Sequence, residues 1–189
     1  MSVRLGAREW RLEAHAIVSR EGHIADAEGH MPEGLVNPFD QARFQGMLDR
    51  ACLAVLGSEG HHRHPQRSGR RRLVVTSQVD GLERDGDAVW RWNPDGATHF
   101  EALADAAPNG GTVAVTGGAR VFEHFLKIGL DRFDLAVSHR CEIPDGRPCL
   151  PDVPDIEGLT QRLEAARLGL ETIEWLDPAT RVELRRYRK

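Results

Sequence analysis

The stretch Thr112-Val-Ala-Val-Thr-Gly-Gly-Ala-Arg-Val-Phe-Glu-His-Phe-Leu126 decides how the chain is expected to fold. A short apolar run around Val113 ends at two adjacent glycines, Gly117 and Gly118. Such runs are typical of strands that are buried on both faces of a sheet. Beyond the glycines, apolar residues recur at helical spacing, at Val121, Phe122, Phe125 and Leu126. The stretch therefore predicts a buried strand, a tight turn and a helix.

Two adjacent glycines at the end of a strand let a ligand or another backbone approach closely. The helix that follows begins with unpaired N–H groups and with the positive end of its dipole, which suits a phosphate. A strand-to-helix turn without any ligand explains the glycines equally well. From the turn alone, a phosphate site and a plain turn are equal alternatives.

Composition indicates a single domain over residues 1–189, because 189 residues with 40% hydrophobic content can bury a full core. The net charge of -4 disfavours general binding to nucleic acid or to a membrane surface. No apolar stretch predicts a transmembrane helix, and the first ten residues show no secretory signal. Three cysteines, Cys52, Cys141 and Cys149, fit free thiols in a reducing compartment. We therefore expect a cytoplasmic protein.

Residues 12–19 alternate in polarity, which predicts a strand with one wholly apolar face. The apolar face consists of Leu12, Ala14, Ala16 and Val18. His15, on the other face, is interpreted as a core or edge histidine rather than a catalyst. Residues 20–36 form a loop of the length typical of functional lids. Its polar residues match no standard metal spacing and are interpreted as solvated; they are His23, Asp26 and His30.

Asn37-Pro38 predicts the start of a helix, because Asn suits the N-cap and Pro suits the first helical position. The apolar stripe of this helix is expected at Phe44, Met47, Leu48 and Ala51. Asp40 lies one turn before Phe44, on or beside that stripe. It is either an acidic residue that the helix dipole favours or a carboxylate that faces a pocket beside an aromatic ring. The sequence around it favours the first interpretation.

Over the rest of the chain, strands and helices are expected to alternate. Strands are predicted at 52–56, 73–75, 88–92 (as an edge strand) and 132–139, helices at 97–107 and 159–168, and an antiparallel hairpin at 170–176 and 181–188. This order indicates an α/β three-layer fold with a mainly parallel central sheet and an antiparallel C-terminal hairpin. In such sheets, ligands collect at the carboxyl ends of the strands.

A polar segment separates the strands at 52–56 and 73–75. Its three histidines, His61, His62 and His64, are interpreted as part of a polar loop, and no metal site is predicted. Its basic run contains Arg67, Arg70, Arg71 and Arg72. One short basic run on an acidic chain indicates a local anionic ligand rather than nucleic acid.

With these pieces placed, the sequence resembles the dihydrofolate reductase family over nearly its whole length. The most specific match is Gly117-Gly-Ala-Arg-Val-Phe122, which resembles the family's Gly-Gly-x-x-[Val/Ile]-[Tyr/Phe] cofactor turn. In the family, a cis peptide joins the two glycines and the N–H groups that follow hold the cofactor pyrophosphate. The resemblance therefore implies that NADPH contacts Gly117, Gly118, Ala119, Arg120 and Val121.

Further cofactor and lid residues follow from the same resemblance. Ile24-Ala25 and Met31-Pro32 are similar to the active-site loop that covers the nicotinamide. The segment Thr76-Ser77-Gln78 resembles the adenosine-phosphate loop, and Gly57-Ser58 falls at the turn that grips the cofactor. The sequence departs from the family at Glu33, where tryptophan is usual, and at Ser58, where arginine is usual; Glu59 then places a negative charge beside the phosphate position.

The resemblance also implies a substrate site. Asp40 with Phe44 matches the substrate carboxylate and the stacking phenylalanine, so Asp40 moves to the favoured catalytic candidate. Ser138 falls at the hydroxyl that partners this carboxylate. Arg70 falls where an arginine pairs with the substrate's α-carboxylate, and Met31 lies in the covering loop.

These matches predict an NADPH-dependent oxidoreductase that transfers hydride to the C=N bond of a pterin such as 7,8-dihydrofolate, in folate and one-carbon metabolism. The expected partner is this small molecule, and the expected assembly is a monomer or homodimer. One alternative is a reductase of the riboflavin-synthesis type that acts on a ribosylated pyrimidine phosphate. A second alternative is a non-catalytic module that binds a nucleotide or a metal.

Overall fold

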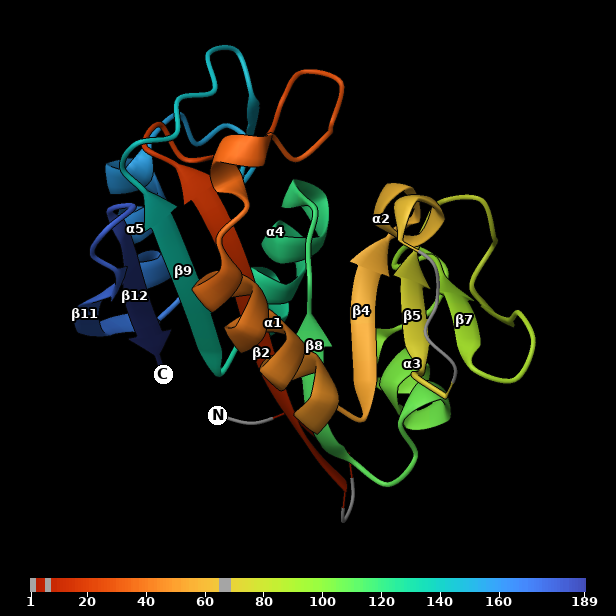
Figure 1. Ribbon diagram of the computed structural model, residues 1–189. Helices are drawn as coiled ribbons and strands as arrows, with labels where there is room; N and C mark the ends of the chain where they lie inside the picture. The colour runs from red at the N-terminus through yellow and green to blue at the C-terminus, as the bar shows by residue number, and fades with distance from the viewer. Residues whose placement is uncertain (1–2, 6–7, 65–68) are drawn as a thin grey trace.

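The computed structural model describes residues 3–5, 8–64 and 69–189, so Arg67 lies outside the described residues. Within them, ten strands form one sheet in the order β11-β12-β9-β2-β8-β4-β5-β7-β6, and β1 pairs with β2 at the side (Figure 1). The strands are β1 (Val3–Leu5), β2 (Arg8–Ser19), β4 (Leu53–Gly57), β5 (Arg72–Val75), β6 (Leu82–Arg84), β7 (Val89–Trp92), β8 (Gly111–Val115), β9 (Arg132–Ser138), β11 (Gly169–Asp177) and β12 (Val182–Arg188).

The centre of the sheet is parallel from β9 across to β7. β12 pairs antiparallel with both β9 and β11, so the predicted C-terminal hairpin and the predicted α/β class are confirmed. The strand predicted at residues 88–92 is confirmed as β7, but its predicted position at the edge of the sheet was wrong. β6 pairs antiparallel with β7 and covers it. A three-residue strand between turns has too few residues to show a period, so the sequence pattern did not reveal it.

Helices cover both faces of the sheet and make the three layers. They are α1 (Pro38–Arg50), α2 (Ser58–Arg63), α3 (His99–Ala106), α4 (Ala119–Ile128), α5 (Ile156–Ala165) and the 3-10 helix η1 (Glu33–Leu35). Figure 1 shows α1 in front of β2 and β8, with α3, α4 and α5 behind the sheet. None of the described helices is long and apolar enough to cross a membrane.

Successive side chains of β2 point to opposite faces of the sheet, so they pack against different helices. The apolar face that the sequence predicts lies in the main core with residues of α3, α4 and α5; it comprises Leu12, Ala14, Ala16 and Val18. The opposite face turns towards α1 and η1, where Ile17 packs with Leu35. His15 lies on this second face, so the strand presents an imidazole to the first turn of α1.

α1 begins where the sequence predicts. The Asn37 side-chain oxygen accepts hydrogen bonds from the N–H groups of Phe39 and Asp40, at 3.0 and 3.1 Å, and Pro38 is the first helical residue. The Asn37 amide also donates to Asp177 at 2.9 Å, which ties the start of the helix to the end of β11. This second bond fixes how the first turn, and therefore Asp40, sits above the sheet.

Two segments predicted as loops contain regular structure. The 20–36 segment forms β3 (His23–Ala25), which pairs antiparallel with β10 (Arg147–Pro148). The interpretation of His23 as solvated was wrong, because its Nδ1 lies 2.7 Å from the carbonyl oxygen of Ile143. The interpretation of residues 58–63 as a loop was also wrong, because they form α2. Both elements depend on partners that are distant in sequence, so local patterns did not reveal them.

The partly buried histidines lead to a prediction on stability. Burial lowers the pKa of His61, His99 and His124 below the ordinary value of 6.5. The unfolded chain therefore binds more protons than the folded chain just below that value. We expect the free energy of unfolding to be highest above about pH 6.5 and to fall as the pH drops through 6.5 towards the lower folded pKa values.

Urea unfolding at about pH 7.5 and about pH 5.5 measures this effect. The double variant His99→Gln/His124→Gln is expected to show a smaller loss of stability on acidification than the wild-type chain. An identical loss in both proteins would mean that other groups cause it.

Candidate active site

A buried, hydrogen-bonded pair of side chains connects the first turn of α1 to the middle of β2. His15 Nε2 and Asp40 Oδ1 lie 2.8 Å apart, and their side chains are only 4% and 7% exposed. A carboxylate that is removed from water needs a hydrogen-bond donor, and the imidazole supplies one. His15 is a core residue, as the sequence indicates, but the sequence did not reveal its partner. The two residues are 25 positions apart and meet only because α1 crosses the second face of β2.

Phe44 lies beside this pair, one turn further along α1. Its ring centroid is 5.8 Å from that of His15, and it packs against the small cluster of Met47 and Leu48. Asp40 is thus a buried carboxylate with an aromatic neighbour on its own helix. The first turn of α1 therefore holds an acidic residue, as one interpretation of the sequence expects, and its carboxylate is buried, as the other expects.

Ser138 lies at the carboxyl end of β9, opposite Ser19 of β2. It is buried, and its hydroxyl donates to the carbonyl oxygen of Gly34 in η1 at 3.5 Å. The resemblance implied that this hydroxyl partners the Asp40 carboxylate. The structure instead pairs the carboxylate with His15 and the hydroxyl with the loop, because η1 lies against the end of β9.

The glycine turn joins β8 to α4 as the sequence predicts. Gly117 has φ +107°, a conformation that favours glycine, whereas Gly118 has φ -35°. Every peptide bond in the described part of the chain is trans, so the cis bond that the resemblance implied is not found at this turn. The N–H group of Val121 donates to the carbonyl oxygen of Gly118 at 2.9 Å. The N–H groups of Ala119 and Arg120 precede it at the start of α4, where no helical carbonyl can pair with them, and are available to an anion.

Three neighbouring strands bring the other predicted cofactor residues to the same edge. Gly57, at the end of β4, donates its N–H to the carbonyl oxygen of Gly117 at 3.1 Å. The Ser58 hydroxyl lies 3.4 Å from the carbonyl oxygen of Val75, the last residue of β5. Directly after β5, Thr76 accepts a hydrogen bond from the Gln78 N–H, which shapes the turn around Ser77. The turns after β8, β4 and β5 are therefore contiguous.

Two predicted substrate residues lie apart from the buried pair. Arg70 Nη2 is 2.6 Å from Asp49 Oδ1, so its guanidinium is bound to the last turn of α1. Met31 is 55% exposed in the loop before η1. Ala25, in contrast, is buried in β3. The structure brings together Asp40, His15 and Phe44, but it does not bring Arg70 or Met31 into contact with them.

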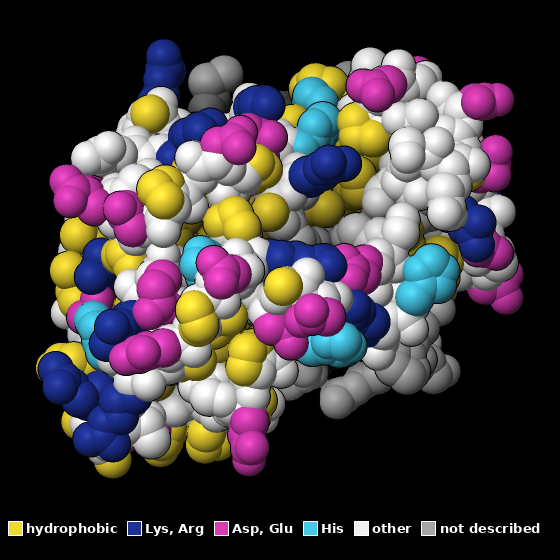
Figure 2. All heavy atoms as spheres, turned by 90° about the horizontal axis from the view of Figure 1, so that it is seen from above, with side chains coloured by type: hydrophobic (Ala, Val, Ile, Leu, Met, Phe, Trp, Pro, Cys, Tyr) yellow, Lys and Arg dark blue, Asp and Glu magenta, His cyan; other side chains and the backbone are white. Residues whose placement is uncertain are grey.

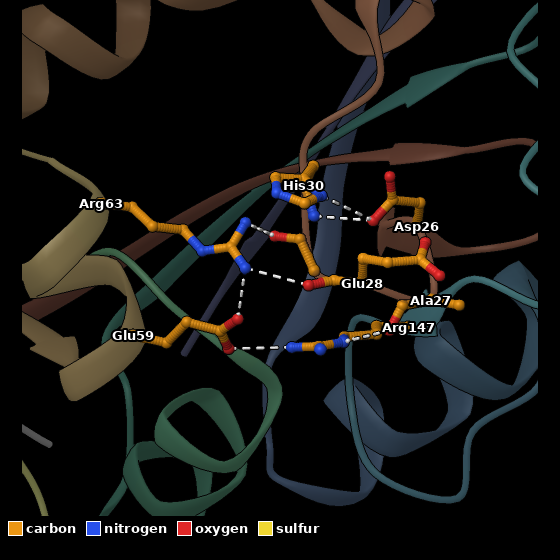
Figure 3. Close-up of polar contacts among 8 residues, drawn as sticks. Asp26, Ala27, Glu28, His30, Glu59, Arg63 and Arg147 are labelled. Carbon is orange, nitrogen blue, oxygen red and sulfur yellow. Dashed lines mark hydrogen bonds and ion pairs between the residues drawn. The ribbon is translucent and has the colours of Figure 1, made fainter.

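Two arginines and one glutamate hold the loop of residues 26–30 near the carboxyl ends of the strands (Figure 3). Arg63, the last residue of α2, donates to the carbonyl oxygens of Glu28 and Gly29 at 2.9 and 2.8 Å. Arg147 of β10 donates to the carbonyl oxygen of Ala27 at 3.1 Å. The Glu59 carboxylate lies between them, 2.7 Å from Arg63 and 2.8 Å from Arg147. We call Glu59, Arg63 and Arg147 the lid latch.

The lid latch leads to a prediction on loop motion. In Glu59→Gln, both arginines lose their charged partner, and exposed ion pairs of this kind contribute about 0–1 kcal/mol each. We expect hydrogen exchange of the 26–30 amides to become roughly three- to tenfold faster. Glu28→Gln is the matched control, since Glu28 meets Arg63 through its backbone carbonyl. Equal exchange in the two variants would contradict a latch made by Glu59.

The charged side chains over the carboxyl ends of the strands are of mixed sign. Figure 2, which looks onto this edge from above, shows basic, acidic and histidine side chains interspersed around apolar ones. No group of three or more metal-ligating side chains of the kind that holds a metal ion is found among the described residues. Attraction of an anionic ligand here therefore depends on particular groups such as the start of α4.

The sheet order, the helices on both faces and the turns after β8, β4 and β5 define the dihydrofolate reductase-like fold. The structure is similar to dihydrofolate reductase from Enterococcus faecalis, complexed with NADP(H) and RAB-propyl, with a TM-score of 0.63 and 20% identity. That match covers 94% of this chain and 95% of the other. The resemblance seen in the sequence is thus confirmed for the fold.

Two proteins of riboflavin synthesis are similar to the same degree. The putative riboflavin biosynthesis protein from Shewanella sp. PV-4 matches with a TM-score of 0.64 and 14% identity, over 94% of this chain and 98% of that one. The Thermotoga maritima diaminohydroxyphosphoribosylaminopyrimidine deaminase/5-amino-6-(5-phosphoribosylamino)uracil reductase matches with a TM-score of 0.62 and 16% identity, over 95% of this chain but 56% of that one. No family model and no curated protein matches the sequence.

Proposed function

We propose that the protein is an NADPH-dependent reductase that transfers hydride to the C=N bond of a flat heterocycle, with a pterin such as 7,8-dihydrofolate as the favoured substrate. The observation that carries this proposal is the buried Asp40 carboxylate, which His15 holds and which lies beside Phe44. In a fold shared with an NADP(H)-bound reductase, a buried acid beside an aromatic ring suits a ring that has both a flat face and polar nitrogens.

The residues at the sheet edge fit a dinucleotide. A Cβ built on Gly118 meets no described atom within 4 Å, so the backbone at the start of α4 is open to a phosphate. The N–H groups of Ala119 and Arg120 would bind the pyrophosphate. The adenosine half would be bound by Gly57, Ser58, Thr76, Ser77 and Gln78. Bound NADPH supplies the hydride. Glu59, whose charge would oppose a phosphate, is paired with two arginines in the lid latch.

The substrate half depends on Asp40. Its Oδ1 is bonded to His15, which fixes the carboxylate and leaves Oδ2 for an N–H of the substrate ring. A carboxyl group in this position delivers or directs the proton that the ring nitrogen needs. Phe44 would stack on the ring, and Ser138 would position the loop of Met31 through Gly34. Arg70 would reach a substrate carboxylate only by leaving Asp49.

A reductase of the riboflavin-synthesis type is the second candidate. The TM-score of 0.64 to the Shewanella protein equals, within 0.01, the value of 0.63 to the Enterococcus reductase. Backbone similarity therefore favours neither substrate. In this alternative, the same edge and the same carboxylate would act on a ribosylated pyrimidine phosphate.

NADPH oxidation in the presence of dihydrofolate tests the proposal directly. We expect saturable NADPH binding and turnover with dihydrofolate. Binding of NADPH together with turnover only on a ribosylated aminopyrimidine phosphate would favour the second candidate. A protein that binds neither NADPH nor NADH would contradict both reductase assignments.

A further inference from the structure

A cavity of about 320 Å³ lies between α1 and the sheet, with β2 and β9 as its floor. Its ionisable lining residues are Glu13, His15, Arg43, Arg50, Arg132 and Asp134. Among the residues assigned to the proposed reaction, His15 alone lines it; Phe44 and the turns after β8, β4 and β5 do not. The cavity is therefore separate from the cofactor edge and touches the proposed chemistry at one side chain.

Two of the charged groups on the floor satisfy each other. Arg132 donates from Nε and Nη2 to the two oxygens of Asp134, at 2.7 and 2.6 Å. This bidentate pairing raises the pKa of Arg132, mainly through the hydrogen bond to Asp134. Arg132 and Asp134 thus form a fixed pair, and neither is left to determine what enters the cavity.

Arg43, on the α1 wall, is only partly satisfied. Its Nη2 lies 3.6 Å from the Asp134 carboxylate, which is longer than a hydrogen bond. Its Nε is buried and has no hydrogen-bond partner. The Nε atom is covered, but the side chain as a whole is 32% exposed and lines the cavity, so its Nη groups remain for an acceptor there.

Arg50 adds a second cation on the same wall. It lies two turns after Arg43 and folds back along α1, so that its Nη1 is 3.4 Å from the position of a Cβ built on Gly46. Gly46 itself lines the cavity, and its missing side chain leaves room for the guanidinium. Two arginines therefore approach the cavity from α1, while Met47 and Ala42 supply apolar surface.

His15 connects this cavity to Asp40. Its Nε2 is taken by the carboxylate at 2.8 Å, so Nδ1 is the ring nitrogen that remains for a group in the cavity. Guanidinium groups match the planar or tetrahedral oxygens of carboxylates and phosphates. The cavity volume is at the small end of the range found for sites that bind small organic molecules.

We propose that this cavity binds a small organic oxyanion, a carboxylate or a phosphate ester, which Arg43 and Arg50 hold and which His15 links to the Asp40 carboxylate. The site does not require the cofactor. It gives the chain a second binding position, behind α1, from which an anion acts on the buried pair.

The test uses the full chain with isotope-labelled histidine and follows the His15 ring resonances by NMR. His15→Gln identifies these resonances. Inorganic phosphate and acetate are the two probes, each titrated against chloride at constant ionic strength, and the tighter of them shows which oxyanion the cavity prefers. We expect a saturable shift of His15 in the wild-type chain and binding weakened about fivefold or more in Arg43→Gln and in Arg50→Gln.

Arg91→Gln is the matched control. Arg91 belongs to β7, forms an exposed ion pair with Asp85, and lies outside the cavity lining. Its removal lowers the net charge equally, and we expect the titration to be that of the wild-type chain. Absence of a His15 shift, or equal weakening in Arg50→Gln and Arg91→Gln, would overturn the proposal. Neither result depends on NADPH oxidation, so failure of this site and failure of the proposed reductase activity are distinguishable.

Discussion

Replacing Asp40 with asparagine is expected to lower the rate of hydride transfer from NADPH to dihydrofolate at least about tenfold, with the fold intact. The amide has nearly the shape of the carboxylate, so its oxygen can still accept the hydrogen bond from His15. It can neither take up nor deliver a proton at the ring nitrogen. The loss should therefore appear in turnover and not in the melting temperature.

Asp49→Asn is the matched control for this variant. Asp49 lies on the same helix, is exposed, and pairs with Arg70. We expect it to keep wild-type turnover on a substrate that does not use Arg70. Unchanged turnover in Asp40→Asn would remove Asp40 from the mechanism.

Replacing Asp40 with alanine tests how much the side chain contributes to stability, separately from its role in turnover. Asp40→Ala leaves the His15 N–H buried without an acceptor, and loss of one partner of a buried pair costs about 3 kcal/mol. We expect Asp40→Ala to lower the free energy of unfolding by about that amount and Asp40→Asn to change it far less. Chemical denaturation of the two variants measures the difference.

The second large effect is expected at the glycine turn. In Gly118→Ala, affinity for NADPH should fall at least about tenfold while the melting temperature stays that of the wild-type chain. The new Cβ meets no described atom within 4 Å, so the protein itself tolerates it. A phosphate bound against the start of α4 would meet this Cβ. Any loss of affinity would then report on the ligand.

Gly117→Ala is the contrasting variant. Gly117 has φ +107°, and an added Cβ would lie 2.9 Å from two ring atoms of Phe122. We expect this variant to lose about 1–3 kcal/mol of stability, whether or not a cofactor is present. Wild-type affinity for NADPH in Gly118→Ala, measured by fluorescence titration, would contradict the cofactor site at this turn.

The regular elements that bury a long apolar face were predictable from sequence. The alternation over residues 12–19 predicts β2 and its core face, and Asn37-Pro38 predicts the start of α1. Both predictions need only residues that are neighbours in the chain, because side-chain alternation in a strand and the geometry of a helix cap are set within a few residues. Short elements such as β3, β6 and α2 were not predicted, since each has few residues. β3 and α2 also depend on contacts with segments that are distant in the chain.

For the glycine turn after β8, the sequence predicted the local structure but not the neighbours of the turn. Its sequence determined that a strand, a tight turn and a helix follow one another, and Gly117 indeed takes a conformation that favours glycine. Only the tertiary structure placed this turn beside Gly57 at the end of β4, through a hydrogen bond between Gly57 and Gly117, which are 60 residues apart in the chain. The site is contiguous because parallel strands end at one edge.

By itself, the sequence determined the α/β fold class, the core face of β2 and the candidate residues Asp40 and Phe44. The tertiary structure alone decided that His15 is the partner of Asp40, that Ser138 bonds to Gly34, and that Arg70 is bound to Asp49. Periodicity and caps reflect backbone geometry over a few residues, so they can be read along the chain. The partner of a buried charge depends on which elements the packing brings together, and no local pattern carries that information.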